Sequence, residues 1–213
     1  MDINTSAIVV TWLSIWGPSV LLAIIALFTP YFAMRIRHWY LRPQLDVEFK
    51  YEPPYFRLFP TNTGRLVYYV RFAVINNGKT QANDCEAVLE KVYWVEDLKN
   101  IRKWIFLPVN LKWSGEDPVR DFETACFRTI YPGGRKTFCD IGHIEENKDG
   151  FSFELPRRFL EQSDILAPGD FKIQISVYAK NAEKVTREFK ISWSGVWKNT
   201  EEEMSEEIII KML

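Results

Sequence analysis

The sequence predicts an all-β fold: an antiparallel β-sandwich of about eight or nine strands, preceded by one transmembrane α-helix. Residues 3–34 contain no charged side chain, and a helix needs only about 20 apolar residues to cross a bilayer. After Pro43 the apolar residues recur with a period of two, which is the period of a strand. We therefore expect an anchor with a basic juxtamembrane segment at residues 1–42 and a sandwich domain at residues 43–213.

The most apolar part of the anchor lies around residues 18–28. Each large aliphatic residue there favours insertion by about 0.3–0.6 kcal/mol near the bilayer centre, and no charge opposes it. Gly17-Pro18 interrupts the run, because proline removes a helical hydrogen bond. Either one long helix kinks there, or the spanning helix begins at Pro18. The predicted anchor residues are Pro18, Val20, Leu21, Leu22, Ile24, Ile25, Leu27 and Phe28.

Basic residues flank one end of this apolar run. Asp2 is the only charged side chain before it, whereas Arg35, Arg37 and Arg42 follow it. Basic flanks remain in the cytoplasm, so we expect a single-pass protein with its N-terminus outside, its arginines at the lipid headgroups and its C-terminal domain in the cytoplasm. A cleaved signal peptide is the competing interpretation, but it requires a basic start, and residues 1–4 contain no Lys or Arg.

The segments after Pro43 alternate between apolar and mostly polar side chains, as half-buried strands do. The alternating segments are residues 45–49, 69–74, 85–90, 171–178 and 189–193. Turn signals rich in Gly, Pro and Asn separate them, at residues 76–78, 114–115, 132–134, 168–170 and 181–182. We also expect a short helical turn at 156–162, and an acidic loop at 201–207 that leads into a last edge strand at 208–210.

Composition excludes several classes of function. Lys and Arg number 27 against 28 Asp and Glu, which argues against a broad nucleic-acid surface. The three cysteines, Cys85, Cys126 and Cys139, form no CxxC pair, and two histidines are too few for the usual zinc patterns. We expect three reduced, mostly buried thiols, which favours a reducing compartment, and we expect no cofactor.

Two short motifs resemble a known family. Residues 74–85 read VINNGKTQANDC, a V-x-N-x-G turn between two strands, and Leu166-Ala167-Pro168-Gly169 reads as an L-x-P-G turn. Both resemble prokaryotic immunoglobulin-like adhesion domains of the CARDB type. The resemblance implies an immunoglobulin-like sandwich and no particular activity. Members of that family are commonly extracellular, whereas the basic flank predicts the cytoplasm, and we give the charges more weight because they act on this chain directly.

Three groups of residues are candidates for chemistry. Cys139 and His143 could form a thiol–base pair, but four residues of extended strand would separate them by roughly 13 Å, so we expect a buried cysteine and a loop histidine. Gly133-Gly134 indicates a hairpin turn. An acidic cluster lacks the spacing of a calcium-binding loop and is expected to be solvated. Its members are Glu116, Asp117, Asp121 and Glu123.

Tryptophans supply the last candidates. Trp113 and Trp193 are expected in the core. Trp104, beside Arg102 and Lys103, is the candidate partner surface because an exposed tryptophan can dominate binding.

These observations favour a membrane-tethered, non-catalytic interaction or accessory module facing the cytoplasm. The expected partners are the lipid bilayer and a protein, which a face of small residues on the anchor could recruit within the membrane; that face comprises Gly17, Ser19, Ala23 and Ala26. One alternative is an outward-facing immunoglobulin-like domain that binds surface glycans or proteins. A second alternative is a thiol-dependent enzyme centred on Cys139.

Overall fold

The chain divides into two compact units, Met1–Arg42 and Pro43–Leu213, which we describe separately. The computed structural model describes residues 19, 22–23, 25–36, 40–61, 64–97, 100–103, 108–157 and 165–213, without the side chains of residues 96–97 and 100–103.

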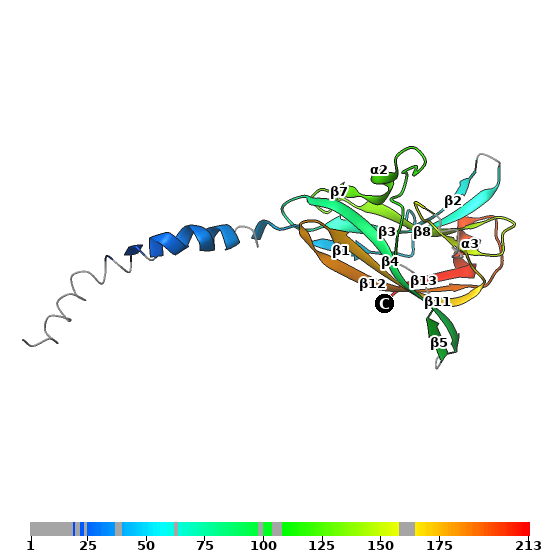
Figure 1. The fold of residues 1–213 in the computed structure, drawn as a ribbon. Coiled ribbons are helices and arrows are strands. Elements are labelled where there is room, and N and C mark those ends of the chain that lie inside the picture. The colour runs from blue at the N-terminus through cyan, green and yellow to red at the C-terminus, as the bar shows by residue number, and fades with distance from the viewer. Residues whose placement is uncertain are drawn as a thin grey trace, which may run out of the picture. The chain divides into compact units, whose positions relative to one another are not determined.

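In the first unit, residues 25–36 are helical (Figure 1). Thr29 Oγ1 donates to the carbonyl oxygen of Ile25 at 2.6 Å, and Arg35 Nη1 donates to Tyr31 Oη at 3.0 Å. Among the described residues, no helix combines the length and the apolar character needed to cross a membrane. Several of the predicted anchor and headgroup residues lie outside the described residues: Pro18, Val20, Leu21, Ile24 and Arg37.

The second unit consists of two antiparallel sheets (Figure 1), which confirms the predicted all-β, sandwich-like architecture. The first sheet has the order β1-β3-β8-β9-β10, and β2 also pairs with β3. Its strands are β1 Leu45–Glu48, β2 Phe56–Pro60, β3 Leu66–Asn76, β8 Thr137–Glu145, β9 Phe151–Phe153 and β10 Ile165–Leu166.

The second sheet has the order β13-β12-β11-β4-β5, and both β6 and β7 also pair with β4. The sequence pattern was clearest here, because β11 and β12 alternate along most of their length. Its strands are β4 Ala82–Asp97, β5 Asn100–Lys103, β6 Val109–Asn110, β7 Arg128–Ile130, β11 Gly169–Ala179, β12 Ala182–Trp193 and β13 Ile208–Met212.

The described residues contain thirteen strands, more than the predicted eight or nine. The additional strands are short; β6 and β10 have two residues each, too few to show a period of two. The predicted edge strand at residues 208–210 is confirmed as part of β13. Most of the helical turn expected at 156–162 lies outside the described residues.

Two short helices lie where the sequence predicted loops. α3 occupies Glu201–Glu207 in place of the expected acidic loop, and α2 occupies Phe122–Cys126 inside the acidic cluster. Thr200 accepts a hydrogen bond from the backbone of Glu203 and so caps α3, while Asp121 caps α2. Because acidic side chains in a first turn also favour a helix, local capping explains why both segments are helical.

The core lies between the two sheets. Phe72 of β3 meets Phe189 of β12 with ring centroids 6.1 Å apart, and Phe151 of β9 meets Phe171 of β11 at 5.6 Å. The predicted core tryptophans are confirmed, since Trp113 and Trp193 are 0% and 3% exposed. The three cysteines are confirmed as buried, unpaired thiols.

Asn76 fixes the turn after β3. This side chain is 0% exposed, yet its Oδ1 accepts from the backbone nitrogens of Gln44 and Gly78, and its Nδ2 donates to the carbonyl oxygens of Thr80 and Ile130. A buried amide needs such partners. The asparagine of the V-x-N-x-G motif therefore joins the starts of β1 and β4 to β7.

Candidate functional site

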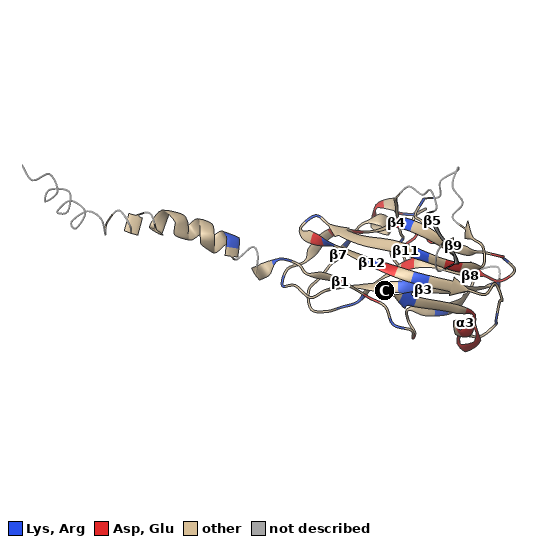
Figure 2. Cartoon of the chain, turned by 90° about the horizontal axis from the view of Figure 1, so that it is seen from below, with Lys and Arg blue, Asp and Glu red and all other residues tan. Residues whose placement is uncertain are grey.

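A hollow of about 370 Å³ lies beside β3, β7 and β8, and we call it the basic hollow. Four cationic residues from separate parts of the chain line it. They are Arg71 of β3, Arg128 of β7, and Arg135 and Lys136 of the β7–β8 connection. No carboxylate belongs to the lining. Figure 2 shows α3 in red, as its acidic residues require.

The rest of the lining consists of four hydroxyl-bearing residues, one of them a tyrosine, and one phenylalanine. They are Ser114, Thr129, Tyr131, Thr137 and Phe138. Hydroxyl groups both donate and accept hydrogen bonds, so the wall combines positive charge with neutral donors. Such a wall suits a small anionic group with several oxygen atoms.

Asp140 is not part of the lining, but it holds two of the lining residues. Arg71 Nε donates to Asp140 Oδ1 at 2.8 Å, and Ser114 Oγ donates to the same oxygen at 2.5 Å. Lys112 Nζ lies 3.9 Å from Oδ2. Burial of the Asp140 side chain, which is 3% exposed, raises its pKa, although the charge of Arg71 and the hydrogen bond from Ser114 oppose this change.

A second carboxylate extends this network. Glu154 Oε2 lies 2.8 Å from Lys112 Nζ, and its Oε1 lies 2.6 Å from His143 Nδ1. Burial alone would raise the pKa of Glu154, but the close approach of His143 Nδ1 and the charge of Lys112 outweigh burial and lower the pKa to about 2. The network is therefore held together by ionised Glu154.

We expect this network to make the fold sensitive to acid. The pKa of Glu154 is lower in the folded chain than its ordinary value of 4.5. Its contribution to the free energy of unfolding is therefore present in full above pH 4.5 and is lost as the pH falls toward 2. The loss should reach up to about 3 kcal/mol. Urea unfolding of the full chain in detergent, measured from pH 6 to 2.5, should show a smaller decline for Glu154→Gln than for the wild type; parallel declines would contradict the assignment.

Two of the remaining cations already have anionic partners. Arg128 pairs with Glu116, and Lys136 Nζ lies 2.5 Å from Glu48 Oε1 and 2.9 Å from Tyr55 Oη. The guanidinium of Arg135 is different: it makes no ion pair or hydrogen bond with any residue that the structure describes. Arg135 is thus the cation of the hollow whose charge is not balanced by a carboxylate.

The structure does not bring Cys139 and His143 together. In the pairing of β8 with β3, Cys139 lies opposite Phe72, which faces the core. His143 lies opposite Tyr69, on the face of the sheet that points away from the core. A β-bulge between these pairs shifts the alternation by one residue. Cys139 is 0% exposed, and burial raises the pKa of its thiol well above the ordinary value, so the thiolate required of a nucleophile is disfavoured.

The other predicted candidates have different outcomes. In the acidic cluster, Glu116 pairs with Arg128 and Asp121 caps α2; among the described residues, no group of three metal-ligating side chains is close enough to hold an ion. Trp104 lies outside the described residues, and Arg102 and Lys103 belong to β5 without described side chains.

Sequence reasoning missed the basic hollow. Its one local signal is the run from Arg128 to Thr137, which contains three cations, three hydroxyl-bearing residues and no carboxylate. Arg71 and Ser114 join this run only through the pairing of β3 with β8 and through the bridge between Trp113 and Cys139.

Comparison with known proteins found no match to a family, to a curated protein or to a solved structure. The immunoglobulin-like resemblance therefore stays a prediction, and the proposed function rests on the geometry of the chain.

Proposed function

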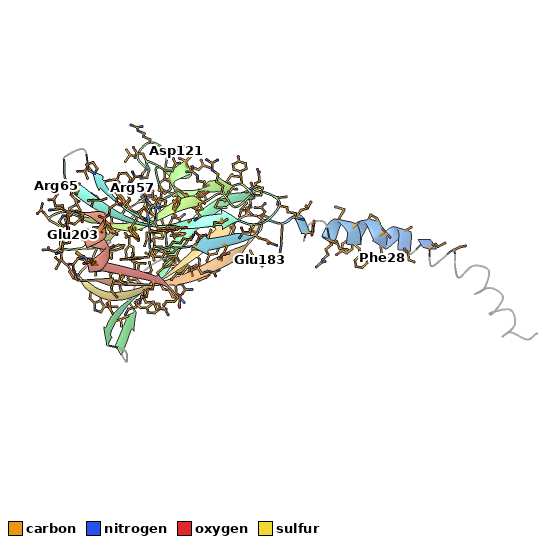
Figure 3. The ribbon with its side chains drawn as sticks, turned by 180° about the vertical axis from the view of Figure 1, so that it is seen from behind. Phe28, Arg57, Arg65, Asp121, Glu183 and Glu203 are labelled. Atoms are coloured by element: carbon orange, nitrogen blue, oxygen red, sulfur yellow. The ribbon has the colours of Figure 1, made fainter. Side chains whose placement is uncertain are left out.

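We propose that the chain is a membrane-tethered, non-catalytic interaction module whose β-sandwich faces the cytoplasm. The observation that carries this proposal is the exposure of apolar side chains around the N-terminal helix. Leu27 and Phe28 are 74% and 51% exposed, and Figure 3 shows Phe28 projecting from the helix. Ile25, Phe32 and Ile36 are also exposed. A helix whose exposed side chains are mostly large and apolar needs a lipid or protein environment.

Two observations support the cytoplasmic side. Arg35 and Arg42 follow the apolar residues, as the cytoplasmic flank of a membrane anchor does. The sandwich contains three buried cysteines without a disulfide, a use of cysteine that is common in reducing compartments. The alternative is an outward-facing domain, and protease treatment of intact cells distinguishes the two orientations.

The proposed protein partner has a candidate surface near the basic hollow. Val119 and Phe122 are 92% and 51% exposed, and Phe127 and Tyr131 are exposed as well. Tyr131 also lines the hollow. Several large apolar side chains exposed within so short a segment are typical of an interaction surface, and tethering would raise the local concentration of such a surface near membrane partners.

Membrane extraction tests the anchor. We expect the full chain to remain in membranes after an alkaline carbonate wash, and the double variant Leu27→Lys/Phe28→Lys to be released, because each lysine near the bilayer centre costs about 2.5–3.5 kcal/mol. The matched control Leu27→Val/Phe28→Leu should stay bound. Release of the wild type would contradict the proposal.

Protease treatment of intact cells tests sidedness on the same material. An epitope tag placed after Leu213 should be protected from added protease and become accessible after the cytoplasmic membrane is permeabilised. Removal of the tag from intact cells would instead establish the outward-facing alternative.

A further inference from the structure

We propose that the basic hollow binds the phosphate group of a small phosphomonoester. The first support is its size. At about 370 Å³, the hollow falls within the range of small-molecule pockets, about 300–1,000 Å³. It therefore has room for a phosphate together with the sugar-sized body that carries it.

The second support is the balance of charge. Three of the four lining cations are each paired with one carboxylate, and these carboxylates are Glu48, Glu116 and Asp140. None of the three belongs to the lining. Arg135 has no such partner within the described part of the chain. A ligand in the hollow would thus meet four positively charged side chains, of which Arg135 is the one without a carboxylate partner among the described residues. The resulting net positive charge selects an anion.

The third support is the kind of donor, which favours phosphate over a simple carboxylate. Three of the four cations are arginines, whose planar forks bind phosphate oxygens in pairs. Four hydroxyl-bearing residues complete the wall. The Ser114 hydroxyl already donates to Asp140, which leaves Thr129, Tyr131 and Thr137 as the neutral donors. A phosphomonoester presents three outer oxygens and about two negative charges, so it can use more of these donors than a carboxylate can.

The fourth support is preorganisation. Arg71 and Ser114 are both held by Asp140, and Lys136 is held by Glu48 and Tyr55. Side chains that are already ordered lose little entropy when a ligand binds. Arg135 is the lining cation that remains available to bind the phosphate. Tyr131 and Phe138 offer aromatic surface to the uncharged part of the ligand.

The phosphate could belong to a soluble metabolite or to a lipid headgroup, and calorimetric titration of the full chain in non-ionic detergent separates these sources. The soluble arm uses ribose 5-phosphate against ribose. The lipid arm uses dihexanoyl phosphatidic acid against dihexanoyl phosphatidylcholine, which lacks a phosphomonoester. We expect binding in at least one arm, selective for the phosphomonoester, and weakening as salt rises.

The variant Arg135→Gln should weaken this binding by at least about tenfold, because a charge-assisted hydrogen bond is lost. Since Arg135 is exposed and unpaired among described residues, the variant should fold normally. Arg120→Gln is the matched control; this arginine is 87% exposed and lies outside the hollow, so affinity should not change.

Absence of phosphomonoester binding in both arms, or equal affinity of the wild type and Arg135→Gln, would overturn the inference. The hollow lies entirely within Pro43–Leu213. The result is therefore independent of whether residues 1–42 anchor the chain, and failure of either proposal leaves the other standing.

Discussion

Replacing Asp140 with alanine should lower the free energy of unfolding by about 3–5 kcal/mol, which is the usual effect of removing one partner from a buried ion pair. Arg71 and Lys112 are each only 17% exposed. Without Asp140, the guanidinium of Arg71 would lose its 2.8 Å partner while remaining largely shielded from water. Urea unfolding of the full chain in detergent, followed by tryptophan fluorescence, measures this loss.

A surface pair provides the comparison for Asp140. Lys180 lies 3.9 Å from Asp84, and both side chains are more than half exposed. Lys180→Ala should therefore change the free energy of unfolding by less than about 1 kcal/mol. A loss for Asp140→Ala no larger than that of Lys180→Ala would show that the network around Asp140 contributes little to stability. Asp140→Asn retains the shape of the side chain and should fall between the two.

The sequence predicted the parts of the fold that repeat a local pattern. Phe171, Ile173 and Ile175 alternate with polar residues, and the strand they predicted is β11. The short strands β6 and β10 contain no such repeat, and their pairing depends on longer neighbours. α3 was missed because its seven residues are too few to show a helical period, although Thr200 followed by Glu203 is a capping signal.

The candidate site was less predictable for two physical reasons. Alternation assigns Cys139 and His143 to the same face, but one bulge in β8 reverses the face of every later residue. The basic hollow depends on contacts between distant segments: Arg71 and Arg135 lie 64 positions apart. A single sequence shows which side chains are charged, but it does not show which cations lack a carboxylate partner once the chain has folded.

Trp113→Ala should be as damaging as the loss of Asp140, with an expected cost of about 3–5 kcal/mol. The side chain is 0% exposed, and its Nε1 donates to the carbonyl oxygen of Cys126 at 3.0 Å. The backbone of Trp113 bridges to Cys139 of β8, and Ser114 N donates to the carbonyl oxygen of Phe138 at 3.0 Å. Trp113 therefore fills the core and also secures the segment that carries Lys112 and Ser114 to Asp140.

These two roles of Trp113 can be separated by measurement. Trp113→Phe keeps most of the apolar volume and leaves the carbonyl oxygen of Cys126 without its donor, so it should cost less than Trp113→Ala, at about 1–3 kcal/mol. If the segment links the core to the charged network, the losses in Trp113→Ala and Asp140→Ala will not add in the double variant, because coupled residues share part of their free energy. Strict additivity would show instead that Trp113 only fills space, and that the position of Ser114 beside Asp140 is fixed by β8 alone.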